Sequence, residues 1–404
     1  MRILDVFPRV AYPPHQGSAV RVYNLLHELS QRHECVGFSH VRSGARFTRP
    51  SLDEVGHGPS YLEVRFTHPL AGVVREVSER AWVRAPVLAG EAFRLARPGR
   101  LRELLAWAEV VLVEFPWQFE HCRRQRPDVP FVYASHNVEA QKFSSYADVT
   151  RPHLTRRPWL SYIRRLEANA ARRAMLVLAV SPEDRQGFVD LYRIEPTKVV
   201  EIPNGADTRH YAPAGRDERA AAKRELGLPD GPLVYFAGSR APPNWTALAW
   251  LQRLAARETR FTYVVVGPVA EPRKDRRLLS TGRVPDLAPY LSAADFAIVP
   301  IASLGGTKIK LFESLAAGLR TVAFAEALHG TAFRDGEHLL VAEKSVGSLE
   351  ACLERLASDR ELAERLGSAG RKLVLERYDW RSTASKLEEA LSRLVAHRAQ
   401  PPAR

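Results

Sequence analysis

The sequence predicts an α/β protein with two doubly wound domains, each a mainly parallel sheet with helices on both faces. Short runs of Val, Ile, Leu and Ala alternate with longer segments of helical periodicity, the pattern of parallel strands that are buried on both faces. These runs form two series on either side of a turn-rich stretch. The 404 residues also exceed the roughly 250–300 that one hydrophobic core usually supports.

The apolar runs locate the strands. They lie at residues 2–7, 110–114, 131–134 and 176–180 in the first series, and at residues 233–237, 263–266, 296–299 and 321–324 in the second. Helical patterns between the strands include residues 20–32, 245–257 and 310–317. Residues 202–218 are the predicted linker. The Arg-rich segment 43–102 has no clear period, and we expect helices with a loop there. An amphipathic helix is predicted at residues 379–397, with a frayed tail after it; its apolar side carries Leu387, Leu391, Leu394 and Val395.

The net charge and the cysteines limit the partners and the cellular compartment that we expect for the protein. The net charge of +13 comes from arginine, because only nine of the 59 basic residues are lysine. A basic balance permits nucleic acid, an anionic membrane or phosphorylated small molecules as partners. Cys35, Cys122 and Cys352 fit no zinc or disulfide spacing, so we expect buried thiols in a reducing compartment. With no signal peptide or spanning segment visible, we expect a cytoplasmic protein with at most peripheral contact to the plasma membrane.

Two loops that follow predicted strands of the first series are candidate sites. In residues 12–18, Gly17 lets the backbone approach a ligand at the start of a helix, but a plain turn capped by Ser18 explains these residues better. His136 follows the strand 131–134 directly. Ligands of doubly wound sheets bind beyond the carboxyl ends of strands, so this histidine is placed to donate to a sugar hydroxyl or accept a proton. A structural cluster at a helix start explains His136 equally well.

Two loops of the second series suggest anion binding. Gly238, Ser239 and Arg240 end a strand, and Asn244 is placed to cap the next helix; such a loop can hold a phosphate through backbone N–H groups and the arginine. An ordinary capped turn is the weaker alternative.

The segment 303–318 is the sharpest candidate. Gly306 and Thr307 open a helix with Lys308 and Lys310 in its first turn. Lysines there oppose the helix dipole, and a bound anion offsets that cost. Glu313, five residues after Lys308, is placed to accept hydrogen bonds from a ribose diol. The alternative is a set of solvated charges, but the Gly-Gly-Thr-Lys start favours a phosphate cradle, without the GxxxxGK[ST] spacing of a P-loop.

Taken together, these segments resemble a retaining glycosyltransferase of the GT-B fold, specifically glycosyltransferase family 4. The motifs that carry the resemblance are AVSPEDRQGF, VVEIPNGADTRHYAP, VYFAGSRAPPNW, VPDLAPYLSAADFAIVP, GGTKIKLFESLAAGLRTVAF and HGTAFRDGEHLLVA. The resemblance implies two Rossmann-like domains that face each other across a cleft. Residues 1–205 would bind the acceptor, residues 206–378 would bind a nucleotide-sugar donor, and residues 379–404 would form a helix that packs back on the first domain.

The resemblance also implies roles for individual residues. Glu313 matches the second glutamate of the family's E-x7-E motif, which holds the donor ribose, while Gly305 replaces the first glutamate. Arg240 and Lys308 are candidates for the two cations on the diphosphate, and His136 matches the histidine near the anomeric centre. The remaining donor-binding candidates are Gly17, Gly238, Ser239, Val284, Gly306, Thr307 and Lys310, with Val284 in the segment that reads the nucleobase.

The implied activity is transfer of a hexose-type sugar to a hydroxyl of a lipid-linked saccharide, polysaccharide intermediate or secondary metabolite. The expected route is a same-face reaction without a metal or other cofactor, in agreement with the missing Asp-x-Asp motif. A nucleotide-sugar epimerase of the same fold is one alternative. The other is a non-enzymatic basic protein that binds nucleic acid or a membrane surface, suggested by seven arginines against one acid in residues 151–173, although such runs are usually solvated helix faces and we expect no nucleic-acid partner.

Overall fold

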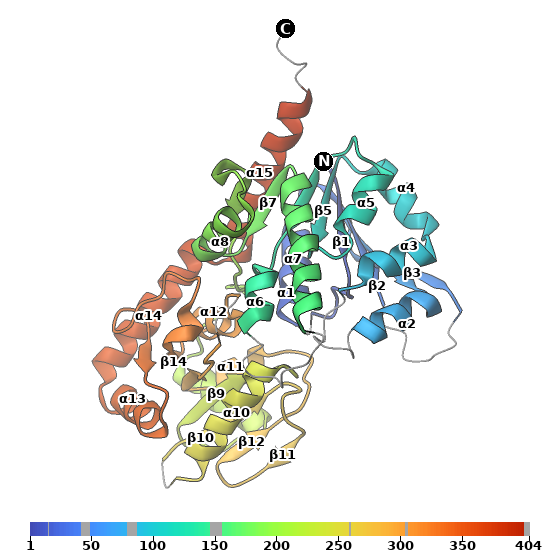
Figure 1. Ribbon diagram of the computed structural model, residues 1–404. Coiled ribbons are helices and arrows are strands. Elements are labelled where there is room, and N and C mark those ends of the chain that lie inside the picture. Colours follow the sequence, from blue (N-terminus) through green and yellow to red (C-terminus); the bar gives the residue numbers. More distant parts are fainter. Residues whose placement is uncertain are drawn as a thin grey trace. The chain divides into compact units, whose positions relative to one another are not determined.

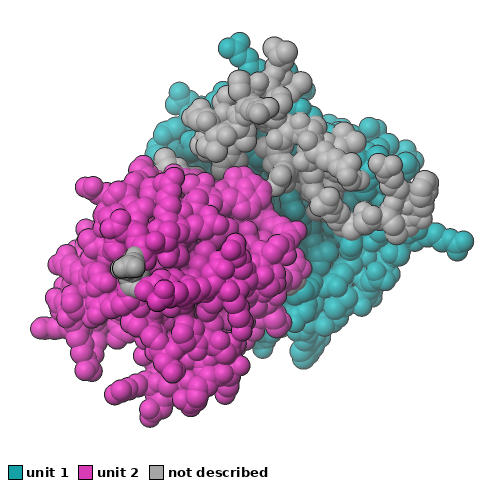
Figure 2. Space-filling model, turned by 90° about the horizontal axis from the view of Figure 1, so that it is seen from below, with its two compact units in different colours: residues 1–203, 383–404 teal, residues 204–382 magenta. Residues whose placement is uncertain are grey.

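The computed structural model of the protein describes residues 1–14, 16–41, 49–78, 87–145, 156–257, 260–303 and 306–399. The chain divides into two compact units, which Figure 2 shows in different colours. Unit 1 comprises residues 1–203 and 383–404, and unit 2 comprises residues 204–382.

Unit 1 is built on an eight-stranded sheet in the order β3-β4-β2-β1-β5-β6-β7-β8. Figure 1 labels its strands β1, β2, β3, β5 and β7. Every neighbouring pair is parallel except β3 with β4. The strands are β1 (Arg2–Phe7), β2 (Glu34–His40), β3 (Ser51–Gly58), β4 (Tyr61–Thr67), β5 (Val110–Glu114), β6 (Phe131–Ala134), β7 (Leu176–Ala179) and β8 (Val199–Glu201). The helices are α1 (Gly17–Leu29), α2 (Pro69–Ser78), α3 (Ala89–Ala96), α4 (Gly99–Trp107), α5 (Phe119–Gln125), α6 (Glu139–Ser145), α7 (Arg156–Arg173), α8 (Pro182–Tyr192) and the 3₁₀ turn η3 (Pro196–Lys198).

Unit 2 is built on a seven-stranded sheet in the order β11-β12-β10-β9-β13-β14-β15, in which only the edge strand β11 is antiparallel. The strands are β9 (Leu233–Ala237), β10 (Thr262–Val266), β11 (Arg273–Lys274), β12 (Leu278–Ser280), β13 (Phe296–Val299), β14 (Arg320–Phe324) and β15 (Leu340–Ala342). The helices are α9 (Arg216–Glu225), α10 (Pro242–Ala255), α11 (Ala288–Ala293), α12 (Ile309–Ala316), η4 (Ala325–Leu328), α13 (Val346–Ser358) and α14 (Arg360–Arg377).

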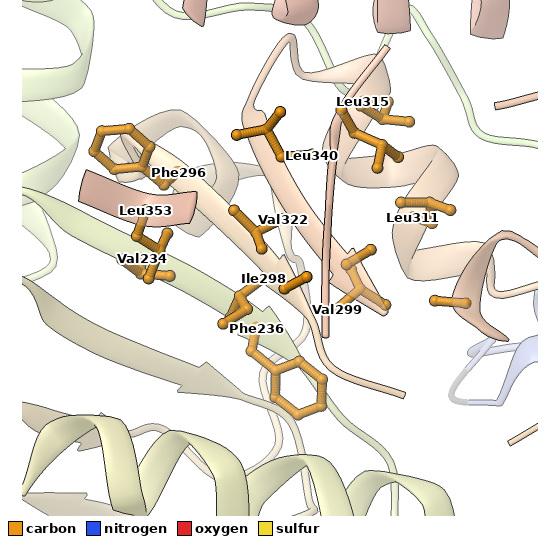
Figure 3. Packing of buried hydrophobic residues seen from close by; sticks show 14 of the residues in the cluster. Val234, Phe236, Phe296, Ile298, Val299, Leu311, Leu315, Val322, Leu340 and Leu353 are labelled. Carbon is orange, nitrogen blue, oxygen red and sulfur yellow. The ribbon is translucent and has the colours of Figure 1, made fainter. Parts of the chain in front are cut away.

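Alternate side chains of β9 in unit 2 enter different cores. Val234 and Phe236 of β9 belong to one apolar cluster together with Leu353 of α13 (Figure 3). Tyr235, between them, belongs to a second cluster with Leu291 of α11. Because successive side chains of a strand point to opposite faces, the sheet is covered on both sides. The predicted doubly wound fold is confirmed.

All eight predicted strands occur in the structure, but segment 43–102 differs from the prediction. Instead of helices with a loop, it begins with the antiparallel hairpin of β3 and β4, followed by α2, α3 and the start of α4; residues 42–48 and 79–86 lie outside the described residues. The charged Glu63 and Arg65 interrupt the apolar pattern of β4, and Glu63 is nevertheless buried in a polar cluster with Ser39 and His57. Because a charged residue occupies a buried position, the apolar pattern of the strand cannot be recognised in the sequence.

The predicted tail helix is α15 (Trp380–Ala399), and residues 400–404 lie outside the described residues. Within unit 1 its Leu387 and Leu391 are buried. Glu388 accepts a hydrogen bond from Nε of Arg32 at 3.0 Å and lies 2.9 Å from Nε2 of His33. The same face of α15 therefore supplies both apolar and ionic contacts to unit 1.

Each sheet has a topological switch point, where the chain winds away in both directions from two neighbouring strands. In unit 1 these strands are β1 and β5, and in unit 2 they are β9 and β13. Ligands of doubly wound folds bind beyond the carboxyl ends of such strands. The loops after these four strands are therefore the places at which to look for a site.

A buried charge cluster occupies the switch point of unit 1. Asp5 of β1 and Glu114 of β5 are each 2% exposed, and Arg21 of α1 is fully buried. Burial and the neighbouring Glu114 raise the pKa of Asp5 well above its usual value, while Arg21 opposes that shift. The Arg21 guanidinium also donates to the carbonyl oxygens of Ile202 and Pro203, at 2.8 and 2.9 Å. The Arg21 side chain therefore links β1 and β5 with the backbone at the end of residues 1–203.

We expect Arg21→Met to lower the free energy of unfolding by about 3–5 kcal/mol at pH 7, because it removes the cation beside Glu114 and Asp5 and leaves two carbonyl groups buried without their donor. Chemical denaturation followed by circular dichroism measures this change. Arg94→Met is the matched control, since the ion pair of Arg94 with Glu91 is exposed and its loss should change stability by about 0.5 kcal/mol or less. Equal stabilities for the two variants would contradict the anchoring role of Arg21.

Candidate functional site

The loop before α12 follows strand β13 at the switch point of unit 2. Gly306 adopts a φ of 62°, and the hydroxyl of Thr307 accepts a hydrogen bond from Asn204 at 2.8 Å. Lys308 is the N-cap residue of α12, not a member of its first turn as the sequence suggested, and its Nζ donates to the Gly306 carbonyl at 2.6 Å. Gly305, which replaces the family's first glutamate, lies outside the described residues.

Helix α12 ends at Ala316, with Ala317 as its C-cap and Gly318 directly after it. This glycine has a φ of 68°, and its N–H donates to Leu315 while the N–H of Leu319 donates to Ser314. These two bonds form a Schellman motif, which requires a left-handed residue after the C-cap. The length and direction of α12, and so the placing of its charged side chains, are fixed at this end.

Helix α12 carries a carboxylate and an ammonium that are both withdrawn from water. Glu313 is 6% exposed, and burial raises its pKa to about 7, although nearby Lys310 opposes the shift. Desolvation lowers the pKa of Lys310 to about 7, against the attraction of Glu313. Over the described parts of the chain, no donor hydrogen-bonds the Glu313 carboxylate. A buried carboxylate without a hydrogen-bond donor destabilises the fold, so its presence points to a ligand that supplies the donor.

The loop after β9 lies at the same switch point. Gly238 is required there, because an added Cβ would lie 2.6 Å from Cγ1 of Val269. Asn244 does not cap α10, whose N-cap is Ala241; its Nδ2 instead donates to the carbonyl and hydroxyl oxygens of Ser239, both at 3.0 Å. Its Oδ1 accepts a hydrogen bond from Nζ of Lys310. The Ser239 loop and α12 are therefore joined into one polar constellation.

Arg240 and Val284 have other contacts within unit 2. The guanidinium of Arg240 is mostly exposed; it pairs with Glu271 at 2.7 Å and donates to the Pro268 carbonyl at 3.2 Å. An exposed pair of this kind contributes at most about 1 kcal/mol. Val284 is half-buried, in the loop between β12 and α11, and packs against the core that contains Leu291.

In unit 1, His136 sits at the carboxyl end of β6, beside the switch point. Its Nε2 hydrogen-bonds the Glu114 carboxylate, and its ring stacks on Phe115 with centroids 4.4 Å apart and an interplanar angle of 20°. Phe115 has a φ of 66°, a conformation that is unfavourable for a bulky residue. Strain of this kind is found where a side chain must be placed for function, and here it places the Phe115 ring under the imidazole.

The backbone around His136 is held by a buried glutamate. Glu167 of α7 accepts hydrogen bonds from the N–H groups of Glu139 and Ala140 at 2.7 and 3.0 Å. It also accepts from the hydroxyls of Tyr133 and Tyr192, at 3.1 and 2.6 Å. Burial nevertheless raises the pKa of Glu167 to about 7. The start of α6, directly after His136, is thereby fixed.

Gly17 is the first residue of α1 and is exposed, with Gln16 in the N-cap position that the sequence assigned to Ser18. The arginine run has one described helix, α7, on which five arginines are exposed; Arg151 lies outside the described residues. These five are residues 157, 164, 165, 172 and 173. Their exposure agrees with a solvated helix face.

The sequence reasoning missed Glu114, Phe115, Asp5 and Arg21. A signal was present, since Asp5 interrupts an apolar strand, Glu114 ends one and Arg21 lies on the apolar face of a helix. Charged residues in such positions are buried only when paired. Among the described residues, no group of three or more His, Cys, Asp or Glu side chains is arranged to hold a metal ion, and no described helix could cross a bilayer.

Comparison with known proteins gives two family models in succession along the chain. "Glycosyltransferase Family 4" matches residues 15–210, and "Glycosyl transferases group 1" matches residues 231–359. A D-inositol 3-phosphate glycosyltransferase from Kineococcus radiotolerans is 26% identical over 307 residues, 68% of this chain and 68% of that protein. One from Acidothermus cellulolyticus is 30% identical over 286 residues, 64% of this chain but only 59% of the relative.

Solved structures share the fold over nearly the whole chain. Sucrose-phosphate synthase from Thermosynechococcus elongatus superposes with a TM-score of 0.73 at 17% identity, covering 98% of this chain and all of that one. HepE from Anabaena, solved in complex with UDP-glucose, gives a TM-score of 0.70 at 16% identity, over 97% of this chain and all of that one. At such identities the likeness concerns the fold. The matched families and these structures together identify the chain as a glycosyltransferase of the GT-B fold that resembles glycosyltransferase family 4.

Proposed function

We propose that the chain transfers a hexose-type sugar from a nucleotide-diphosphate sugar to a hydroxyl acceptor, with retained configuration and without a metal ion. The observation that carries the proposal is the Glu313 carboxylate, buried next to Lys310 with no hydrogen-bond donor among the described residues. A ribose diol offers two donors to such a carboxylate. The free energy lost by burying Glu313 would then be recovered when the donor nucleotide binds.

The donor diphosphate would bind at the start of α12. The helix N-terminus offers N–H groups, Lys308 adds a cation at the N-cap and Lys310 adds a second one in the first turn. Gly238 and Ser239 would bring backbone groups from the neighbouring loop, and Arg240 would have to exchange Glu271 for phosphate in order to join them. Fixed positive groups at this place stabilise the negative charge that develops as the nucleoside diphosphate leaves.

The reaction would proceed on one face of the sugar. The bond between the anomeric carbon and the diphosphate oxygen breaks, and the acceptor oxygen bonds to the same carbon. The acceptor proton passes to the leaving phosphate oxygen, so no protein carboxylate is needed as a nucleophile. His136, whose ring Glu114 and Phe115 hold in place, would contact the donor sugar near its anomeric centre.

The substrates to try first follow from the relatives. HepE was solved with UDP-glucose, which makes UDP-sugars the first donors. The sequence relatives are named for D-inositol 3-phosphate, a phosphorylated polyol, which makes such polyols the first acceptors. Lipid-linked saccharides are the second class, in keeping with the net charge of +13 and the attraction of basic proteins to anionic surfaces.

If Glu313 is retained for a ligand, Glu313→Gln should stabilise the empty protein at pH 8. The pKa of this carboxyl is raised from 4.5 to about 7 in the fold. The contribution of the protonated carboxyl to the stability of the wild type is therefore complete below pH 4.5 and is lost as the pH rises through 7. The difference corresponds to about 3 kcal/mol. Denaturant unfolding at pH 8 and pH 4.5 measures it, with equal stabilities of variant and wild type expected at the lower pH.

The exposed Glu361→Gln on α14 is the control for this measurement, and its stability should match the wild type at both pH values. A Glu313→Gln variant that is less stable than the wild type at pH 8 would show that the carboxylate serves the fold, which contradicts its assignment to a ligand.

Transfer itself should depend on the same residues. A thermal-shift screen against UDP-, GDP-, ADP- and dTDP-sugars identifies the donor, because a ligand that binds only the folded state raises the melting temperature. With that donor, Glu313→Ala and Lys308→Ala should each lower kcat/KM about 100-fold or more, with circular dichroism spectra unchanged and Glu361→Ala as the control. Full activity in both variants would refute the site. Release of epimerised donor with no modified acceptor would refute the reaction.

A further inference from the structure

The side-chain amide of Asn244 joins the two loops of the unit 2 constellation. Asn244 lies in the first turn of α10 and is 7% exposed. Its Nδ2 donates to the Ser239 carbonyl at 3.0 Å. That carbonyl oxygen can only accept, which fixes the orientation of the amide. The amide oxygen must therefore face Lys310, as observed.

The ammonium of Lys310 is held on a second side by an aromatic ring. Its Nζ lies 4.4 Å from the centroid of Phe236, the β9 residue two positions before Gly238. The charged groups that act on it are Glu313, which stabilises the ammonium, and Lys308, which repels it. A ring face, a neutral amide oxygen and a carboxylate one turn away therefore define the position of this cation.

The chemical type of residue 244 matters. A neutral amide oxygen orients an ammonium with one hydrogen bond and does not neutralise it, whereas a carboxylate would pair with it and repel phosphate. An ammonium has three donors, so one bond to Asn244 leaves capacity for an anion. Since the N-cap of α10 is Ala241, helix capping does not account for Asn244.

We propose that Asn244 is a positioning residue of the donor site, whose amide is anchored on the Ser239 loop and sets Lys310 in the single geometry that receives the donor diphosphate. The inference rests on the proposed function. It goes beyond that function by assigning Asn244 to the recognition of phosphate through another residue.

A double-mutant cycle on UDP binding tests the assignment. By titration calorimetry, Asn244→Ala should weaken UDP binding about 10-fold or more, and Lys310→Met at least as much. If Asn244 acts through Lys310, adding Asn244→Ala to Lys310→Met should cost less than about 3-fold, because the side chain that it positions is already gone. Thr246→Ala, on the exposed side of the same helix, is the control and should bind UDP like the wild type.

The pH dependence of UDP binding gives a readout that a merely structural role would not move. The pKa of Lys310 is lowered to about 7, so affinity should fall as the pH rises above neutrality, where Glu313 is already ionised. In Asn244→Asp the new carboxylate favours the ammonium, and the fall should move upward by one pH unit or more. This variant also keeps the test valid if Asn244→Ala does not fold.

Additive effects of Asn244→Ala and Lys310→Met, or an unshifted pH dependence in Asn244→Asp, would overturn the role of Asn244 while leaving the proposed function intact. If the unchanged protein binds none of UDP, GDP, ADP and dTDP, the proposed function fails, and this inference fails with it.

Discussion

Two residues of opposite charge on one short helix impose the main constraint on the candidate site of unit 2. Lys310 and Glu313 are neighbours on one face of α12, and both lie where desolvation disfavours the charged form. Their positions depend on the Schellman end at Gly318 and on the amide of Asn244. The β9 and β13 loops meet around this pair because the sheet winds away from those two strands in opposite directions.

Unit 1 repeats the arrangement with different chemistry. At its switch point the charges of Asp5, Glu114 and Arg21 are also buried, but here a cation faces two acids and donates to backbone carbonyls. Glu114 in turn fixes His136. A network of this kind gives a histidine one defined orientation, whereas the pair in unit 2 leaves a carboxylate without a donor among the described residues. The first arrangement orients a side chain, and we propose that the second receives a ligand.

The strands and the helix of the α12 candidate site could be predicted from the sequence because each is a local pattern. Buried parallel strands are continuous apolar runs, and Gly306 to Glu313 is one uninterrupted motif. The hairpin of β3 and β4 was missed because the buried Glu63 breaks its period. The pairing of Asn244 with Lys310 joins residues 66 positions apart, and that of Glu114 with His136 joins residues 22 apart. Such pairs depend on the order of strands, which no local pattern contains.

We propose that α12 of unit 2 binds a nucleoside diphosphate through one cation and one carboxylate. The number of protons taken up on binding tests this, when UDP, or whichever of the four nucleotides binds best, is titrated at pH 7.5 in buffers of different ionisation enthalpy. With the pKa of Lys310 and that of Glu313 each at about 7 in the empty protein, a bound diphosphate should restore the ammonium, while the ribose hydroxyls should displace the remaining proton of the carboxylate. We therefore expect a net uptake of about half a proton. Binding with no proton uptake, and with an affinity that Lys310→Met leaves unchanged, would contradict it.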